Sequence, residues 1–230
     1  MSTQGSTSSS STTQDQFWRS AGHQMKTSLN LLSHRMNAFL EEGGDPQEKQ
    51  EIQAELKHLS GLLKDSLTFS RSGHLPKTAF RAEKKDLGKT IQNITRKYIP
   101  QEKASQISFD LGKGILITEI DEKLFKEALR TILENAMTYS PKGNINISLR
   151  ATQKKAILSI KNTGSGINQD DLPHIFEPFY RGASDQEGTG LGLSIASRIA
   201  LQHQGQLTAQ SDGATWTEFI FELPLISIVE

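Results

Sequence analysis

Residues 187–196 read EGTGLGLSIA, in which glycines at positions 188, 190 and 192 precede an apolar stretch. Glycine lets the backbone approach a ligand closely, and the apolar stretch predicts a helix whose first N–H groups would point at that ligand. This combination favours a phosphate-binding turn. The alternative is a flexible loop, because alternating glycines are not specific on their own. Neither the Gly-Lys-Ser/Thr of a P-loop nor the βαβ context of a dinucleotide site is present.

Predicted helices and strands alternate irregularly around this turn. Apolar residues spaced by three and four predict helices over residues 86–99, 121–140 and 192–205. Alternating apolar and polar residues predict strands over 107–111 and 115–120, a β-hairpin over 145–162, and a closing pair of strands over 207–224. Helices mixed with antiparallel strands in this way indicate an α+β fold, in which residues 86–226 form a two-layer α/β sandwich.

Residues 17–72 have a purely helical pattern. Each of two predicted helices carries one apolar stripe, formed by Met25, Leu29, Leu32, Met36 and Phe39 and then by Ile52, Leu56, Leu59 and Leu63. Between them, EEGGDPQE at 41–48 contains two glycines and a proline, as expected for the turn of an antiparallel helical hairpin. Two uncovered stripes favour dimerisation into a four-helix bundle. The alternative is that the hairpin docks on the rest of its own chain.

Two segments are predicted to lack regular structure. Residues 1–16 are rich in Ser and Thr and low in complexity, so we predict a disordered tail. Residues 73–85 include Gly73 and Pro76 and lie between the two helical and α+β parts. We therefore predict a hinge linker there.

Composition excludes several classes of function. The 230 residues carry 26 Lys plus Arg and 26 Asp plus Glu, so no overall basic field favours nucleic acid or an anionic membrane. Because the chain has no cysteine, disulfides, thiolate catalysis and zinc–thiolate sites are ruled out. No apolar run approaches the roughly 18 residues that cross a bilayer, and no signal peptide is visible.

Two polar side chains are candidates for chemistry. His23 lies off the apolar stripe of its predicted helix, so it is either an ordinary surface histidine or an imidazole held in water for a reaction. Asn135 lies beside the buried edge of the 121–140 helix. Its amide either caps a neighbouring strand or supplies an oxygen to Mg²⁺, which prefers hard ligands.

Five motifs occur in order along the chain. They are HQMKTSL at 23–29, LENAMTYSP at 133–141, NTGSGI at 162–167, LPHIFEPFYRG at 172–182 and GTGLGLSIA at 188–196. This series closely resembles the transmitter core of the sensor histidine kinases of bacterial two-component systems, within the wider ATPase family that includes gyrase, Hsp90 and MutL. The resemblance spans residues 17–225, and its last two motifs together are highly specific.

The resemblance implies a role for each matching position. His23 would accept the γ-phosphoryl group, with Gln24 and Thr27 in the same phosphoacceptor segment. Asn135 would bind Mg²⁺, and Tyr139 would flank the nucleotide. The other ATP-binding positions would be Asn162 and Thr217 at the adenine, Gly164, Gly166 and Ile167 in the first glycine segment, and Gly188, Thr189, Gly190, Leu191 and Gly192 at the triphosphate. A short mobile lid would cover residues 182–187.

Four positions depart from the commonest pattern of the family. Gln24 replaces an acidic residue, and an amide can orient the imidazole but cannot accept its proton. Ser28 replaces a proline, which predicts a less kinked helix. Asn162 replaces an aspartate, so adenine selection is expected to be weaker by about 1 kcal/mol. Thr131 replaces Asn or Glu four residues before Asn135, which leaves no carboxylate to activate water and favours transfer to histidine.

The function implied by the resemblance is that of an ATP-dependent histidine autokinase. A homodimer would bind Mg²⁺ and ATP, phosphorylate His23 and pass the phosphoryl group to an aspartate in the receiver domain of a response regulator. Thr27 leaves open a phosphatase activity toward that regulator. The protein would be cytoplasmic, or the cytoplasmic part of a longer membrane-anchored sensor, and would contact neither nucleic acid nor, within this chain, a membrane.

The alternative class is a degenerate dimeric scaffold that binds nucleotide without phosphotransfer. Gln24 and Asn162 motivate this alternative, because each replaces a carboxylate by an amide. The five histidines other than His23 match no motif and are expected to be surface or packing residues.

Overall fold

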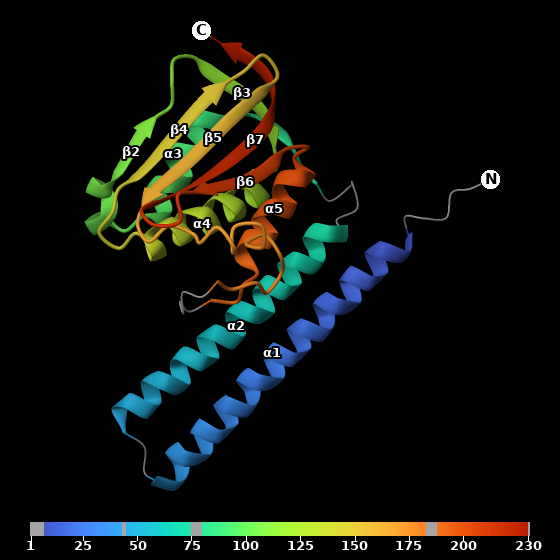
Figure 1. Ribbon diagram of the computed structural model, residues 1–230, viewed down its shortest axis with the longest axis vertical. Helices are drawn as coiled ribbons and strands as arrows, with labels where there is room; N and C mark the ends of the chain where they lie inside the picture. Colours follow the sequence, from blue (N-terminus) through green and yellow to red (C-terminus); the bar gives the residue numbers. More distant parts are fainter. Residues whose placement is uncertain (1–6, 43–44, 75–79, 183–187, 230) are drawn as a thin grey trace, which may run out of the picture.

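The computed structural model of the chain describes residues 7–42, 45–74, 80–182 and 188–229, with the backbone alone at 7–16, 41–42 and 71–74. A long helical hairpin, α1 (Thr7–Glu42) and α2 (Pro46–His74), precedes an α+β domain (Figure 1). The hairpin projects from one end of the domain, and α2 contacts helix α5 (Gly192–Gln202). The predicted α+β architecture, with a hairpin first and a sandwich second, is confirmed.

The start of α2 shows why the turn of the hairpin lies where the sequence places it. Asp45 Oδ1 accepts hydrogen bonds from the backbone N–H groups of Gln47 at 2.6 Å and Glu48 at 2.8 Å. In return, Glu48 Oε2 accepts from the N–H of Asp45 at 3.1 Å. This reciprocal pair is a capping box, and Pro46 occupies the first helical position, where its missing N–H costs nothing.

Seven strands form one sheet in the α+β domain. They are β1 (Glu83–Asp86), β2 (Ile107–Asp110), β3 (Ile115–Ile120), β4 (Ile145–Ala151), β5 (Lys155–Thr163), β6 (Gln206–Ser211) and β7 (Trp216–Val229). The order along the sheet is β1-β3-β7-β5-β4-β2, and β6 also pairs with β7. All pairs are antiparallel except β2–β4, which is parallel. The predicted hairpin of residues 145–162 is the β4–β5 pair.

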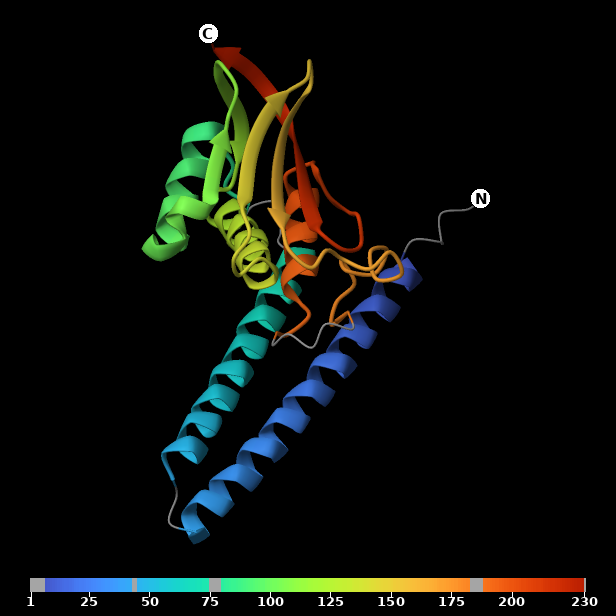
Figure 2. The same ribbon diagram turned by 60° about the vertical axis from the view of Figure 1, so that its left-hand side comes forward.

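Three helices cover one face of this sheet, as Figures 1 and 2 show: α3 (Leu87–Tyr98), α4 (Glu122–Tyr139) and α5. A short 3₁₀ helix, Gln101–Gln106, follows α3. Asp86 and Asp121 cap the N-termini of α3 and α4 by accepting hydrogen bonds from the first-turn N–H groups. The predicted two-layer sandwich is therefore present.

The core lies between the helical layer and the sheet. Phe125 of α4 is fully buried and meets Phe221 of β7 edge-on, with ring centroids 5.6 Å apart. The apolar positions that alternate along β4, β5 and β7 point into the same cluster, and the side chains between them are more exposed. This alternation is what a sheet covered on one face requires.

Two predicted segments differ from the structure. Helix α1 begins at Thr7, so the prediction of a disordered tail over 1–16 is wrong for 7–16, and residues 1–6 lie outside the described part. A helix that has nucleated gains one hydrogen bond per added residue, so it can extend through residues of low helix propensity. The predicted hinge over 73–85 is also too long, because β1 at its end pairs with β3 and belongs to the sheet.

The hairpin is not free of the domain. Phe17, Ala21, Leu62 and Phe69 belong to the buried cluster that continues into the α+β domain. The hairpin therefore docks on its own chain at the end that lies away from its turn, as the alternative expected. Other apolar residues of the hairpin remain exposed, and they are Trp18, Leu29, Leu31, Met36, Leu40, Leu56, Leu63 and Leu67.

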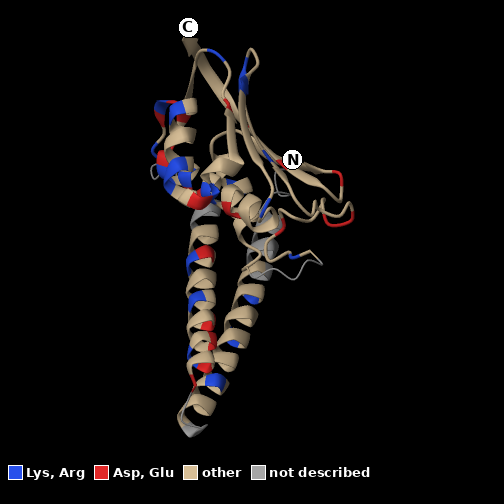
Figure 3. Cartoon of the chain, turned by 90° about the vertical axis from the view of Figure 1, so that its left-hand side faces the viewer, with Lys and Arg blue, Asp and Glu red and all other residues tan. Residues whose placement is uncertain are grey.

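Charges of both signs are interspersed over the molecule. Figure 3 shows charges of both signs along α2 and over the helical layer of the domain, whereas the charged residues of α1 between positions 17 and 40 are all basic. This distribution matches the equal totals of acidic and basic residues in the sequence.

Candidate functional site

His23 lies on α1 with its side chain exposed to solvent. The buried face of this part of α1 is formed by Phe17, Ala21 and Ser28. His23 is two residues from Ala21, or about 200° around the helix, so it points away from that face. An imidazole in this position is open to a reactant that comes from outside the hairpin.

The two neighbours of His23 in the phosphoacceptor segment lie differently. Gln24 is half-buried, and Thr27 is exposed with its hydroxyl donating to the backbone carbonyl of His23 at 3.0 Å. A threonine hydroxyl within a helix commonly donates to the carbonyl four residues earlier in this way.

Asn135 and Tyr139 lie one turn apart near the C-terminal end of α4, and both are half-buried. The side-chain amide of Asn135 makes no hydrogen bond to any other described residue, so it does not cap a strand. Tyr139 is joined to the first glycine segment by a hydrogen bond, in which its carbonyl oxygen accepts from the N–H of Ser165 at 3.4 Å.

The first glycine segment follows β5 and needs its glycines for close backbone approach. A Cβ on Gly164 would collide with the Tyr139 carbonyl oxygen, and one on Gly166 would collide with the backbone of Ala214. Gly166 also has a φ of 66°, which other residues adopt rarely. Ile167, next in the chain, packs against the core and donates its N–H to Ser211 Oγ at 2.8 Å. The segment thus joins α4 to the end of the sheet.

Asn162 and Thr217 face each other across the β5–β7 pair, at the end of the sheet that carries this segment. Both side chains are buried, with exposed fractions of 1% and 4%. The side-chain oxygen of Asn162 has no hydrogen-bond partner in the described part of the chain. A buried acceptor without a partner costs free energy, so this oxygen is suited to a donor that a ligand brings.

The second glycine segment leads into α5. Gly190 has a φ of 68°, and a Cβ there would lie 2.7 Å from the carbonyl carbon of Phe179. The N–H of Phe179 donates to the Gly190 carbonyl at 2.8 Å, which holds the two stretches together. A Cβ on Gly192 would lie 2.9 Å from the Thr131 methyl group, so the small side chain at this departure from the family pattern lets α5 approach α4 closely.

The N-terminus of α5 is open to a ligand. Leu191 is the N-cap residue and supplies no side-chain hydrogen bond to the first turn. No atom of the described residues lies within 4 Å of the place where a Cβ on Gly188 would be. Uncapped N–H groups at the start of a helix form a binding site for an anion such as phosphate.

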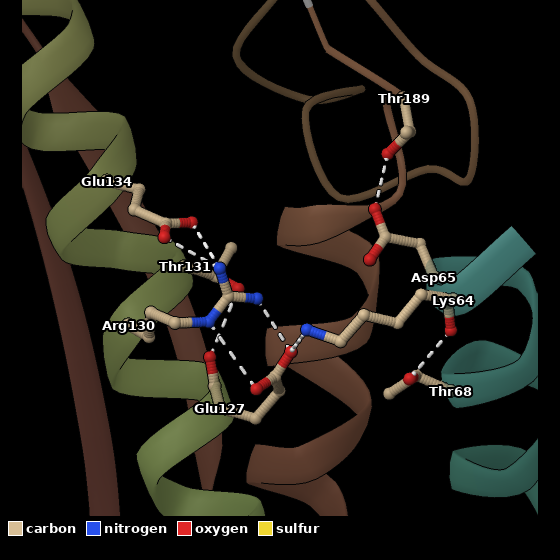
Figure 4. A network of polar contacts seen from close by, with 8 residues as sticks. All are labelled: Lys64, Asp65, Thr68, Glu127, Arg130, Thr131, Glu134 and Thr189. Atoms are coloured by element: carbon tan, nitrogen blue, oxygen red, sulfur yellow. Dashed lines mark hydrogen bonds and ion pairs between the residues drawn. The ribbon is translucent and has the colours of Figure 1, made fainter. Parts of the chain in front are cut away.

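A polar network that the sequence did not predict joins the hairpin to these elements (Figure 4). Lys64 of α2 contacts Glu127 of α4 at 3.5 Å, and the adjacent Asp65 accepts from the Thr189 hydroxyl at 2.7 Å. Arg130 lies between Glu127 and Glu134, at 2.6 Å from each. The spacing of these three α4 residues is visible in the sequence. No sequence signal identifies Asp65.

The charge states in this network follow from its geometry. Burial works against the charge of Arg130, but hydrogen bonds to its two carboxylates raise its pKa above the ordinary value. Burial of Glu127 is similarly outweighed by Arg130 and Lys64, and its pKa is lowered. Asp65 differs, because burial dominates and raises its pKa.

An aromatic cluster accompanies the network. Phe17 of α1 stacks on Phe69 of α2 and on Phe179, with ring centroids at 4.1 and 5.2 Å. The guanidinium of Arg198 on α5 lies 3.5 Å from the Phe69 ring centroid and donates to the Phe69 carbonyl at 3.1 Å. The sequence marked Phe179 as part of a motif but predicted no partner for it.

The structure therefore brings the predicted ATP-binding positions together and leaves His23 apart on the hairpin. The unpartnered Asn162 oxygen, the open start of α5 and the close backbone contacts at the glycines fit a purine nucleotide with its phosphates. The predicted lid over 182–187 lies outside the described residues except for Gly182.

A cation site would depend on few protein ligands. Within the described ranges, no three His, Cys, Asp or Glu side chains are grouped as a metal site would require. A Mg²⁺ ion here would be held through the Asn135 oxygen, substrate phosphates and water, a donor set that suits this ion. No helix in the described part of the chain is long and apolar enough to span a membrane.

Comparison with known proteins agrees with this geometry. Residues 120–227 match the family of histidine kinase-, DNA gyrase B- and HSP90-like ATPases. The sensor histidine kinase RppB of Synechocystis sp. is 31% identical over 229 residues, which are 94% of this chain and 50% of RppB. This chain spans about half the length of the curated relatives that it matches.

Two solved structures have the same fold. The histidine kinase AdeS of Acinetobacter baumannii aligns with a TM-score of 0.69 at 21% identity, over 89% of this chain and 98% of AdeS. The histidine kinase ThkA, solved in complex with the response regulator protein TrrA, aligns with a TM-score of 0.73 at 21% identity, over 89% of this chain and 60% of ThkA. With a helical hairpin followed by an ATPase domain of this family, the chain is a transmitter core of the sensor histidine kinases of two-component systems.

Proposed function

We propose that the chain is an ATP-dependent histidine autokinase that phosphorylates His23 and then transfers the phosphoryl group to an aspartate of a response regulator. One observation carries the proposal. A buried acceptor without a partner among the described residues, and a helix N-terminus without a side-chain cap, occur in the same chain as an exposed histidine on a helical hairpin. The relatives are named sensor histidine kinases, which supports the same reaction.

The nucleotide would lie across the ends of β5, β7 and α4. Asn162 would accept from the exocyclic amino group of adenine, with Thr217 beside it and Tyr139 along the nucleotide. Gly164, Gly166 and Ile167 would shape the base side of the pocket, and Gly188, Thr189, Gly190, Leu191 and Gly192 would surround the phosphates. The uncapped N–H groups of α5 would then stabilise negative charge on the phosphates.

Asn135 is the proposed ligand for Mg²⁺, since its amide is half-buried and uncommitted. The ion, when bound, would neutralise charge on the phosphate oxygens. The chain itself contributes the backbone donors and the position of the nucleotide.

In the transfer step, a lone pair of one imidazole nitrogen of His23 attacks the γ-phosphorus. A P–N bond forms, the bond between the γ-phosphorus and the bridging oxygen breaks, and ADP leaves with the electron pair. The neutral imidazole ring carries this lone pair on the nitrogen that holds no proton. Gln24 can orient the ring but cannot take up its proton, which therefore passes to solvent.

The second transfer would occur on a response regulator that docks beside His23. The basic residues Arg19, Lys26 and Arg35 of α1 suit the acidic pocket of a receiver domain. An aspartate oxygen attacks the phosphoryl group, the P–N bond breaks, and the imidazole recovers its lone pair. We also propose that Thr27 supports a phosphatase activity. In that reaction Thr27 would help to position a water molecule that attacks the phosphoryl group on the regulator aspartate.

We also propose that the working unit is a homodimer in the cytoplasm, where ATP is supplied. The exposed apolar residues of the hairpin support this, among them Leu40 and Leu67 with exposed fractions of 71% and 52%. Burying such residues in a four-helix bundle would remove them from water.

Incubation with γ-labelled ATP and Mg²⁺ tests the autokinase proposal. We expect label that is lost in acid and stable in base, and that is absent from a His23→Gln variant. His34→Gln is the matched control, because His34 is a second exposed histidine on α1, and it should retain the label. No label at any Mg²⁺ concentration would favour the alternative, a scaffold that binds nucleotide without phosphotransfer.

A further inference from the structure

Two consecutive residues of α2 reach the two elements that border the nucleotide site. Lys64 contacts Glu127, two turns before Asn135 on α4, and Asp65 contacts Thr189 in the second glycine segment (Figure 4). Thr189 also lies beside Gly61 of α2, since its methyl group is 4.0 Å from the place where a Cβ on Gly61 would be. The hairpin therefore lies directly against the phosphate end of the site.

Asp65 places a negative charge where an anion is expected. Its carboxylate accepts from the Thr189 hydroxyl, and that same hydroxyl accepts from the N–H of Leu191 at 3.3 Å. The carboxylate is thus linked through one hydroxyl to the turn that starts α5. Phosphate oxygens brought to this turn would be repelled by the carboxylate at close range.

The contact is held by more than the polar pair. Phe17 and Phe69, with exposed fractions of 4% and 3%, stack on each other, and Phe17 also stacks on Phe179, whose backbone is bonded to Gly190. In this arrangement the glycine segment faces α2, while His23 points away from the buried face of α1. The site is therefore docked on the hairpin without facing the histidine of its own chain.

From these contacts we propose that Asp65 is an autoinhibitory clasp: its carboxylate holds Thr189 against α2 and competes with the phosphates of ATP for the second glycine segment. The inference rests on the proposed function, because it takes this segment as the phosphate site. Nucleotide binding and docking of the hairpin then oppose each other, and by linkage any movement of the hairpin that breaks the clasp strengthens ATP binding.

The affinity of the full chain for a non-hydrolysable ATP analogue, measured by calorimetry with Mg²⁺, tests the clasp. We expect Asp65→Ala to bind the analogue roughly three- to tenfold more tightly than the unchanged chain, the size expected for the net contribution of one typical hydrogen bond. Asp65→Asn keeps the side-chain size and an acceptor without the charge, so its affinity should lie in between. Glu55→Gln removes one negative charge elsewhere on α2 and should leave the affinity unchanged.

The outcomes separate the two proposals. If Asp65→Ala folds, as judged by its thermal melt, and binds the analogue no more tightly than the unchanged chain, the clasp is wrong and the nucleotide site stands. The same result for a folded Asp65→Asn would confirm that conclusion. If neither the variants nor the unchanged chain binds the analogue, the proposed nucleotide site is wrong and the clasp falls with it.

A disulfide trap gives a second readout, because the chain contains no cysteine of its own. Gly61→Cys with Thr189→Cys should form a disulfide under mild oxidation, since their side chains would be near neighbours. We expect saturating analogue to slow the reaction severalfold. Failure to form the bond without nucleotide, or an equal rate with it, would overturn the competition between docking and ATP.

Discussion

The core of the α+β domain and its contact with the hairpin are both buried, but they are built from different groups. The core between α4 and β7 is mostly apolar, with Phe125 and Phe221 almost completely buried. The contact with the hairpin mixes aromatic rings with charged side chains, as at Phe69 and Arg198. Opening an apolar contact exposes its surface to water at a large cost in free energy, whereas a mixed contact recovers the hydration of its charges when it opens.

This difference indicates which contact in the molecule can open. The domain should remain folded in every functional state, while the hairpin contact should open and close. A histidine that points away from its own nucleotide site requires such opening before transfer within one chain. The predictions below test the contrast, beginning with the largest expected effect.

Truncating one aromatic residue in each region should separate the two. Phe125→Ala is expected to lower the free energy of unfolding of the α+β domain by about 3–5 kcal/mol, because it leaves a cavity in the core. Phe69→Ala should lower it by less than about 1 kcal/mol, since Phe69 stabilises the docking and not the domain. Denaturant unfolding followed by Trp216 fluorescence in a Trp18→Phe background measures both. Equal losses would contradict the contrast.

The domain core also contains a buried histidine, as expected of a packing residue. His203 Nε2 accepts from the N–H of Asp121 at 3.0 Å, so the ring proton is on Nδ1, which donates to the Ile199 carbonyl at 2.7 Å. Burial lowers the pKa of His203. The unfolded chain therefore binds the proton more readily, and the stability of the domain is complete above the ordinary pKa of about 6.5 and falls as the pH drops below it.

The slope should reach at most about 1.4 kcal/mol per pH unit for one proton. Unfolding measured at pH 7.5 and pH 5.5, with His203→Gln beside the unchanged chain, checks this. The variant should show a smaller change in unfolding free energy over this range. An equal change in both proteins would assign the pH dependence to other groups.

Asn162 is a buried residue at the border between the core and the proposed nucleotide site. Asn162→Asp should improve discrimination of ATP over GTP by about 1 kcal/mol, or roughly fivefold in the ratio of dissociation constants, because a carboxylate only accepts hydrogen bonds. An amide can turn and donate to the oxygen of guanine. Titration of both nucleotides against the two proteins gives the ratio, and an unchanged ratio would remove Asn162 from base selection.

The smallest effect is expected at the outer ion pair of the hairpin contact. Lys64 is mostly exposed, with 61% of its side-chain area accessible, so its pair with Glu127 should contribute less than about 0.5 kcal/mol. Lys64→Gln should therefore change the affinity for the ATP analogue by less than about twofold. If Lys64→Gln changed the affinity as much as Asp65→Ala, the inhibition would have to be assigned to the whole polar network and not to the Asp65 carboxylate alone.

Most secondary structure was predictable because its signals are local. The apolar spacing along α4, the alternation along β5 and the capping box at Asp45 each depend on residues within a few positions of one another. β1 was not predictable, because Glu83–Asp86 has no strand pattern and becomes a strand only by pairing with β3. The helical start at Thr7 was missed because composition outweighed the continuation of a formed helix.

By itself, the sequence determined the order of the elements and the family motifs, from which the nucleotide-binding positions are proposed, since each of these depends on residue type and short spacing. Only the tertiary structure decided that Asp65 meets Thr189, 124 residues away, that Phe17 stacks on Phe179, and that the Asn162 side-chain oxygen has no hydrogen-bond partner among the described residues. Such contacts depend on how whole surfaces pack against each other, and no local pattern in the chain encodes that packing.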